Sequence, residues 1–480
     1  MSPLDAASDD ILRAILDECS QRELYQLSLV SRRLRVLAES RLYSTIQSTW
    51  THTTDPITFL LLRSILARPV LASQIRNLVF RSDRGRMGCD LPIKISPPTD
   101  EEELMKIFAV IRGSGIPCED ATLWTKEIRE GSIDAPLAVL LSLLPNLTSI
   151  FLDKDFTRTS TSFRIMLKHA LRTDGLTGVS VFISDLTSLR KVNLSGVLHI
   201  TTNGRGITVQ KNPKLILFVL LFLYSPGIQH LSAIVDDPGS LVWPTNTACS
   251  STLTSLHLSK IREGNLGQIL SHCPNLQTLS YFWYVDEDCS SPLLPFLDCQ
   301  SLDYSLSYVQ TSLKLLRIAA DFQPTWIDCV DLLPPRGMIG TITTLPKFLL
   351  LEKLEIPFFL LLGPEHSANP MLGELLPPNL RQLSLTDGLA AAEEDEWEDP
   401  QKFLLVLTNW LADSTWKTHT PQLETLELYY IDWYRQMTEE SRHQFKDLDE
   451  RFGVRVKVTG ENPNQFGSLL FPRAKGQKWS

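Results

Sequence analysis

A short leucine phrase recurs along the chain and constrains its fold more than any other feature. The phrase L-x-x-L-x-L, or a close variant, follows a proline at 145–152, 274–281, 378–385 and 421–428. It stands without that proline at 75–80, 189–194, 228–233, 253–258, 313–318 and 351–356. Because proline ends a preceding helix and favours extended backbone, each phrase predicts a short strand with its leucines buried.

Apolar runs with helical character precede several of these strands, at 137–144, 215–224, 266–271 and 403–411. A strand, a helix and a second parallel strand form a right-handed crossover, which is the unit of an α/β solenoid. The pattern resembles the leucine-rich repeat family. That resemblance implies an α/β fold in which residues 75–460 form a right-handed solenoid. An alternative interpretation is a set of leucine-rich helices.

The repeats are irregular. Equivalent leucines are 23 residues apart at Leu256 and Leu279 but 43 apart at Leu383 and Leu426, whereas a regular array holds roughly 20–29. We therefore expect inserted loops, and composition places them at 83–99, 201–213, 235–251, 320–346 and 363–378.

Capping signals predict further helices and a closing strand. Thr99 and Glu102 form a capping box that begins a helix through Ile111. An amphipathic helix is predicted at 439–452, and the alternating segment 454–458 predicts a final strand that caps the array.

The first forty-odd residues predict three short helices. Ser8 is a candidate N-cap of the first, and Ser20 with Glu23 forms a capping box that begins the second. A third helical run covers 29–40. The apolar residues at helical spacing are Ile11, Leu12, Ile15, Leu16, Leu24, Leu27, Val30 and Leu34. A unit of about 40 residues rarely buries enough surface to be stable alone, so the rest of the chain, a partner, or both must cover this excess.

This stretch resembles the F-box, through D-I-L-x-x-I-L at 10–16 and E-L-x-x-L-x-x-V-S-R at 23–32. The resemblance covers 7–46 and implies docking on the Skp-type adaptor of a cullin–RING ubiquitin ligase. It assigns the adaptor contact to the eight apolar residues named above. The family usually has Leu-Pro where this chain has Ala7-Ser8, and tryptophan where it has Leu34. These differences favour two alternatives: a vestigial F-box, or an N-terminal helical cap.

The expected domains are an F-box at 7–46, a helical linker at 47–74, the solenoid at 75–460 and a tail at 461–480. In the leucine-rich repeat family, residues flanking the second and third leucines point to the concave side. This implies a target-binding set of His257, Ser259, Ser280, Phe282, Arg317, Ala319, Glu355, Ser384, Thr386, Glu427 and Tyr429. The acidic run at 393–399 is a second candidate, for a basic partner segment, although such runs are usually solvated.

Composition limits the function classes. A net charge of −9 argues against a nucleic-acid partner, and the longest apolar run, 215–224, is too short to span a membrane. The chain begins without a secretory signal pattern. Its eight cysteines include no CxxC pair, so we expect reduced, mostly buried thiols in the cytoplasm or nucleus.

No catalytic motif is recognisable, and His257 and His272 lack partners at metal-ligand spacing. We therefore expect no enzyme activity, no cofactor and no metal. The sequence favours a substrate-recognition adaptor of an SCF-type ubiquitin ligase that binds an unknown protein target. The alternative is a non-ligase scaffold.

Overall fold

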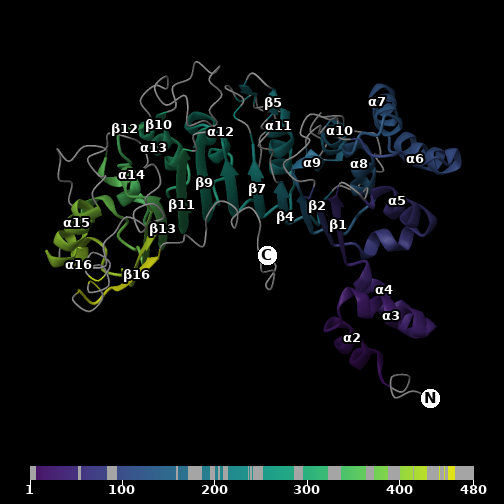
Figure 1. Ribbon diagram of the computed structural model, residues 1–480, viewed down its shortest axis with the longest axis horizontal. Coiled ribbons are helices and arrows are strands. Elements are labelled where there is room, and N and C mark those ends of the chain that lie inside the picture. Colours follow the sequence, from purple (N-terminus) through teal and green to yellow (C-terminus); the bar gives the residue numbers. More distant parts are fainter. Residues whose placement is uncertain are drawn as a thin grey trace. The chain divides into compact units, whose positions relative to one another are not determined.

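The computed structural model describes residues 7–51, 56–83, 94–157, 161–170, 186–194, 201–203, 206–208, 214–235, 237, 241, 252–285, 296–322, 337–363, 372–386, 400–413, 416–429, 443, 448 and 452–459. The fold is α/β with a large parallel sheet, and the chain forms two compact units (Figure 1). Unit 1 comprises Met1–Thr201, Lys214–Leu231 and Val242–Cys249, and unit 2 comprises Thr202–Pro213, Ser232–Leu241 and Ser250–Ser480.

Unit 1 begins with the three-helix unit, formed by α2 (Asp9–Asp17), α3 (Gln21–Val30) and α4 (Arg32–Leu42). The predicted caps are confirmed: Ser8 accepts a hydrogen bond from the Ile11 amide, and Ser20 and Glu23 form a reciprocal capping box. The third helix begins at Arg32 rather than at 29. The reason is Ser31, whose extended backbone ends α3 and whose side chain caps α4.

The sheet of unit 1 contains one strand that the sequence did not predict. Its parallel strands pair in the order β1 (Thr45–Thr51), β2 (Asn77–Asp83), β3 (Ser149–Leu152) and β4 (Lys191–Leu194). The segment 47–74 is predicted to be a helical linker, but β1 occupies its start. The prediction is therefore wrong at 47–51. β1 lacks the leucine phrase, but its threonines and Trp50 favour a strand. From residue 56 onward the described part of the linker is mainly helical, as α5 (Thr58–Ala67) and the 3-10 helix η1 (Pro69–Gln74).

The other elements of unit 1 are mainly helical. They are α6 (Glu101–Gly113), α7 (Cys118–Arg129), α8 (Asp134–Ser142), α9 (Lys154–Thr157), α10 (Thr161–Ala170), α11 (Lys214–Leu221) and the 3-10 helix η2 (Phe222–Tyr224). Every residue of α8 is buried. The helix predicted after Thr99 is present as α6, but Asp100 caps it, accepting from the Glu102 amide at 3.0 Å.

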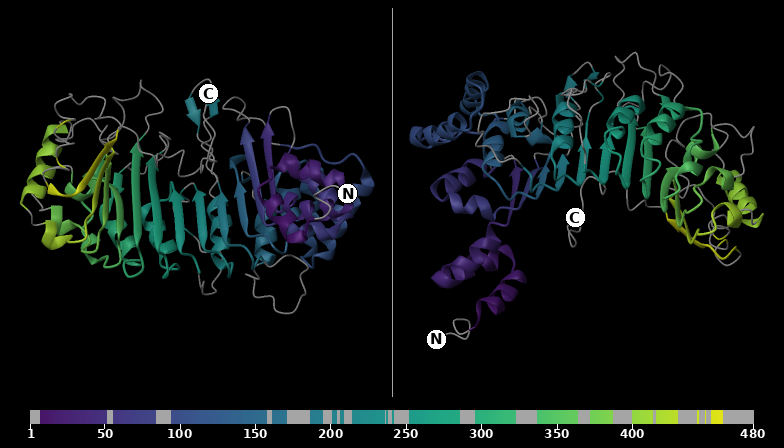
Figure 2. Two further views of the ribbon diagram at one scale, coloured as in Figure 1. Left: turned by 90° about the horizontal axis from the view of Figure 1, so that it is seen from below. Right: turned by 180° about the vertical axis from the view of Figure 1, so that it is seen from behind.

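Unit 2 is built on parallel strands that all point the same way (Figure 2). They pair in the order β8 (Ser255–Ser259), β9 (Thr278–Val285), β11 (Leu315–Phe322), β13 (Lys353–Pro357), β14 (Gln382–Thr386), β15 (Thr425–Tyr429) and β16 (Arg455–Thr459). β7 (His230–Ile234) lies at the boundary of the two units. The strands predicted from the phrase and the closing strand are all confirmed.

The spacing of the leucines in sequence varies, but their register in the sheet does not. The middle leucine of the phrase forms one buried row, of Leu256, Leu279, Leu316, Leu354, Leu383 and Leu426. Since successive strand residues point to opposite faces, the residues on either side of each leucine project from the other face. The inserted residues therefore lengthen the connections without changing the register.

The connections of unit 2 carry short elements. They are α12 (Glu263–Leu270), β10 (Phe296–Asp298), α13 (Cys299–Ser307), β12 (Gly337–Ile339), η4 (Leu345–Lys347), α14 (Phe359–Leu362), η5 (Leu372–Leu375), α15 (Pro400–Ala412) and α16 (Trp416–His419). α12 and α13 approach closely at Gly267, where a Cβ atom would lie 2.6 Å from the Ser305 Oγ.

Several segments predicted as loops contain regular structure. The segment 201–213 includes the strand pair β5 (Thr201–Asn203) and β6 (Gly206–Thr208), and β12, η4 and η5 fall within two others. The acidic run 393–399, most of the predicted helix 439–452, and the tail lie outside the described residues. Within the described part of the chain, no helix is both long and apolar enough to cross a bilayer.

Candidate protein-interaction surfaces

Four residues of the predicted adaptor-binding set are buried in the core of the three-helix unit. Leu12, Leu16, Leu24 and Leu34 are at most 5% exposed and pack in one cluster with Leu37 and Ala38. Leu27 is partly buried against the same cluster. In this conformation the unit's own core covers these four leucines, and adaptor binding by the set stays a prediction.

Six other large apolar side chains of this unit face outward. They are 42–69% exposed, and we call them the apolar surface of the three-helix unit: Ile11, Ile15, Tyr25, Leu29, Val30 and Val36. Ile11, Ile15 and Val30 belong to the predicted set, whereas Tyr25, Leu29 and Val36 do not. The spacing of Tyr25 and Leu29, four residues apart on one helix, was the signal that could have found these two.

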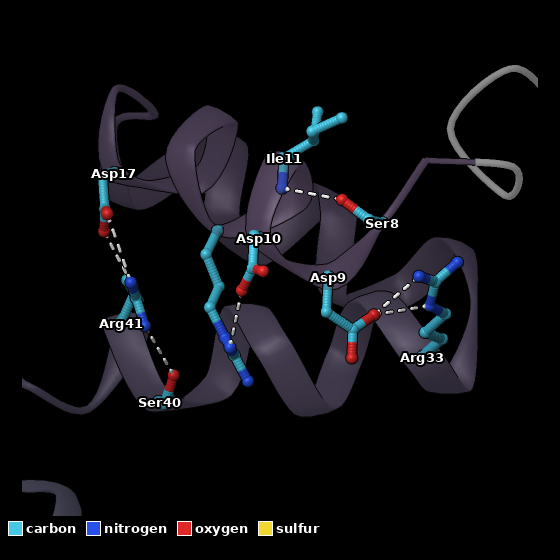
Figure 3. A network of polar contacts seen from close by, with 9 residues as sticks. Ser8, Asp9, Asp10, Ile11, Asp17, Arg33, Ser40 and Arg41 are labelled. Atoms are coloured by element: carbon cyan, nitrogen blue, oxygen red, sulfur yellow. Dashed lines mark hydrogen bonds and ion pairs between the residues drawn. The ribbon is translucent and has the colours of Figure 1, made fainter.

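Two ion pairs fix the first helix to the third. Arg33 contacts Asp9 with Nη2 2.6 Å from Oδ1, and Arg41 contacts Asp17 with Nε 2.7 Å from Oδ1. The hydrogen bond from Arg41 lowers the pKa of Asp17. Figure 3 shows these pairs, with Ile11 on the side of α2 that points away from them. The ion pairs thus hold α2 against α4 and leave Ile11 free of that contact.

The three-helix unit continues directly into the sheet of unit 1. Only Tyr43 and Ser44 separate α4 from β1, and their amides still donate to carbonyls of the last helical turn, at 3.0 and 3.1 Å. The Gln21 side chain on α3 donates from Nε2 to the carbonyl of Thr45 at 3.1 Å. The connection is therefore short and hydrogen-bonded.

In unit 2 the predicted target-binding residues lie in two neighbouring rows on the face opposite the leucines. The first row, in register, is His257, Ser280, Arg317, Glu355, Ser384, Glu427 and Lys457. The second row contains Ser259, Phe282 and Ala319, and then Pro357, Thr386 and Tyr429. The structure therefore brings the predicted set together on one sheet face.

A third row on this face was missed. It contains Ser255, Thr278, Leu315, Lys353, Gln382, Thr425 and Arg455. Each of these residues precedes the middle leucine of its phrase or the equivalent valine of β16, so the same alternation could have identified it from the sequence.

Glu427 is the centre of a hydrogen-bond network on this face. Its carboxylate accepts from Lys457 Nζ at 2.8 Å, Tyr429 OH at 2.8 Å, Gln382 Nε2 at 2.7 Å and Ser384 Oγ at 3.2 Å. Burial raises the pKa of Glu427, but the hydrogen bonds outweigh burial and leave that pKa below its ordinary value. The carboxylate is therefore held in its charged form.

The described residues show the state of four cysteines and whether side chains gather to bind a metal ion. Cys19, Cys118, Cys273 and Cys299 are free thiols; Cys273 and Cys299 are buried, and Cys118 is exposed. Burial raises the pKa of Cys299 to about 12, so this thiol is unreactive. Over the described ranges, no group of three or more histidine, cysteine or acidic side chains could hold a metal ion.

No model of a known protein family matches the sequence, and no curated protein is detectably similar to it.

Proposed function

We propose that this protein is a substrate-recognition adaptor of an SCF-type cullin–RING ubiquitin ligase. Residues 7–46 act as an F-box that binds a Skp-type adaptor, and 75–460 act as a leucine-rich-repeat-like solenoid that binds a target protein. The observation that carries the proposal is the apolar surface of the three-helix unit. Five leucines and Ala38 fill the core, yet six large apolar side chains stay outside it, as expected of a unit that docks on a partner.

In this role the protein performs no bond chemistry itself. It brings the lysines of a bound target close to a ubiquitin-charged enzyme, so that transfer proceeds at a raised local concentration. The in-register strands of unit 2 support the solenoid interpretation, because each repeat adds one strand beside the last. The role requires a cytoplasmic or nuclear location, and neither a membrane nor a nucleic acid is a partner.

The test is co-expression with a Skp-type adaptor, followed by size-exclusion chromatography. We expect a one-to-one complex with the wild-type chain and its loss with Val30→Asp, which places a charge on the apolar surface. Val70→Asp is the matched control, because Val70 lies outside 7–46 and is 70% exposed against 69% for Val30. Ile11→Asp provides a second variant on another helix. If a folded Val30→Asp and a folded Ile11→Asp both co-elute as the wild type does, the proposed contact is wrong.

A non-ligase scaffold with a vestigial F-box is the second candidate. Leu34, which stands where the F-box family usually has tryptophan, is 3% exposed and belongs to the core. Leu34 therefore exposes no apolar surface at the position where the F-box family usually has tryptophan. A wild-type chain that elutes alone, folded and soluble, in the presence of the adaptor would favour the scaffold.

A further inference from the structure

The three rows on the face of unit 2 opposite the leucines carry a charge opposite in sign to that of the whole chain. The chain has a net charge of −9, but between β8 and β16 these rows hold two carboxylates and four cations. The carboxylates are Glu355 and Glu427, and the cations are Arg317, Lys353, Arg455 and Lys457. The three rows therefore have an excess of two positive charges within an acidic protein, and Asp321, paired with Tyr284 further along β11, adds one carboxylate to the same face.

The two carboxylates are buried and already paired. Glu355 accepts from the Arg317 Nε at 2.5 Å, and Glu427 accepts from the Lys457 Nζ at 2.8 Å. Their side chains are 9% and 11% exposed, whereas that of Lys457 is 53% exposed. Solvent consequently meets Lys457, reaches the 18% exposed Arg317 less, and hardly meets the two carboxylates.

The other two cations carry the excess charge. Lys353 and Arg455 are exposed, and neither forms an ion pair with another residue of the described chain. Arg317 uses only its Nε in the bond to Glu355, so its two Nη groups remain available as a planar fork that matches a carboxylate. Beside Arg317 in register, the Oγ of Ser280 is buried without a hydrogen-bond partner. Together these four residues offer hydrogen-bond donors that have no acceptor within the described chain.

The spacing of the cations suits an extended chain. Lys353 and Arg455 lie in one register row with β14 and β15 between their strands, which places them about 14 Å apart at about 4.8 Å per strand. An extended peptide advances about 3.3 Å per residue, so roughly four residues span that distance. Acidic side chains on every second residue would all face the sheet.

We infer that this face binds an extended acidic segment of a target protein, with carboxylates of that segment on Lys353, Arg455 and the free edge of Arg317. A basic segment would meet like charges here. The inference deepens the proposed function and rests on it only in taking the segment to belong to a ligase target. Binding to the face itself requires no adaptor.

The test uses the full-length purified chain and a fluorescein-labelled peptide of about ten residues that alternates glutamate and serine. Fluorescence anisotropy is measured against a matched peptide with lysine in place of glutamate. We expect the acidic peptide to bind more tightly, and its binding to weaken with added salt because exposed charges are screened. The double variant Lys353→Glu/Arg455→Glu should bind it at least roughly tenfold more weakly.

The control variant is Lys347→Glu, an exposed cation on η4 outside the three rows, which should bind as the wild type does. Thermal unfolding of both variants checks that they fold, and these exposed positions make folding the expected result. Equal affinity for the two peptides, no binding of the acidic peptide, or an unchanged affinity in the double variant would each overturn the inference. A chain that binds the acidic peptide but not the Skp-type adaptor would contradict the proposed function and leave the inference standing.

Discussion

Glu39 on α4 and Arg68, which separates α5 from η1, form an ion pair through two contacts of 2.7 Å each. The Nη1 of Arg68 donates to Oε1 of Glu39, and the Nη2 donates to Oε2. This paired geometry is the strongest arrangement available to an arginine and a carboxylate. It joins the three-helix unit to the helical segment that precedes β2.

The pair predicts a pH-dependent contribution to stability. The hydrogen bond from Arg68 lowers the pKa of Glu39, so its contribution is present above the ordinary carboxyl pKa and is lost as pH falls through the lowered value. Arg68→Gln should therefore be less stable than the wild type at neutral pH, and the difference should shrink in acid. Urea unfolding at several pH values measures this. Arg63→Gln, on α5, is the control and should show no such trend.

Leu24 and Leu29 provide a matched pair on one helix. Leu24 is buried in the core of the three-helix unit and Leu29 is exposed on its surface. Leu24→Ala should lower the free energy of unfolding by about 2–5 kcal/mol, because it leaves a cavity. Leu29→Ala should change it by less than about 0.5 kcal/mol. Urea denaturation of both variants measures the difference, and similar losses would contradict the burial of Leu24.

Tyr429 should respond to the charge of Glu427. Burial, followed by the hydrogen bond to Glu427, raises the pKa of Tyr429, so Glu427→Gln should lower this pKa while leaving it above the ordinary value. An ultraviolet titration detects the ionisation, and subtracting the Tyr429→Phe background isolates one tyrosine among ten. Glu424→Gln, an exposed position just before the same strand, should leave the titration unchanged. A pKa unaffected by Glu427→Gln would argue against the 2.8 Å contact.

Glu263 at the start of α12 should destabilise the fold at neutral pH. It is buried, and burial raises its pKa. The penalty for its charged form is complete above the raised pKa and disappears as pH falls to the ordinary carboxyl value. Glu263→Gln should therefore raise the free energy of unfolding at neutral pH but not in acid. Calorimetric or urea unfolding compares it with Glu352→Gln, an exposed control for which no gain is expected.

The strands were predictable because each leucine phrase carries its own local signal. The phrase determines both the strand and the face its leucines occupy, and parallel pairing then aligns equivalent positions. β1 was missed because it has no leucine phrase, and its pairing with β2 depends on contacts with a segment about thirty residues away. Likewise, the contact between Lys457 and Glu427 requires the register of β16, which the sequence alone does not supply.

The division of the three-helix unit into core and surface was not predictable from spacing alone. On α2, Ile11 and Ile15 follow the same four-residue period as Leu12 and Leu16. Neighbouring helical residues differ by about 100° in direction, so the two stripes cannot both point straight at the core, although an apolar face of that width is common. The packing of α3 and α4 selects the leucines, and no property of α2 by itself makes that choice.

The short passage from α4 through Tyr43 and Ser44 into β1 has a mechanical consequence. A long flexible tether would let β1 sample many orientations relative to α4, whereas two residues bonded to the preceding helical turn restrict them. A partner that binds α2 to α4 would therefore also set the direction of β1. Lengthening this passage by a few glycines would free the direction of β1 from that of the three helices.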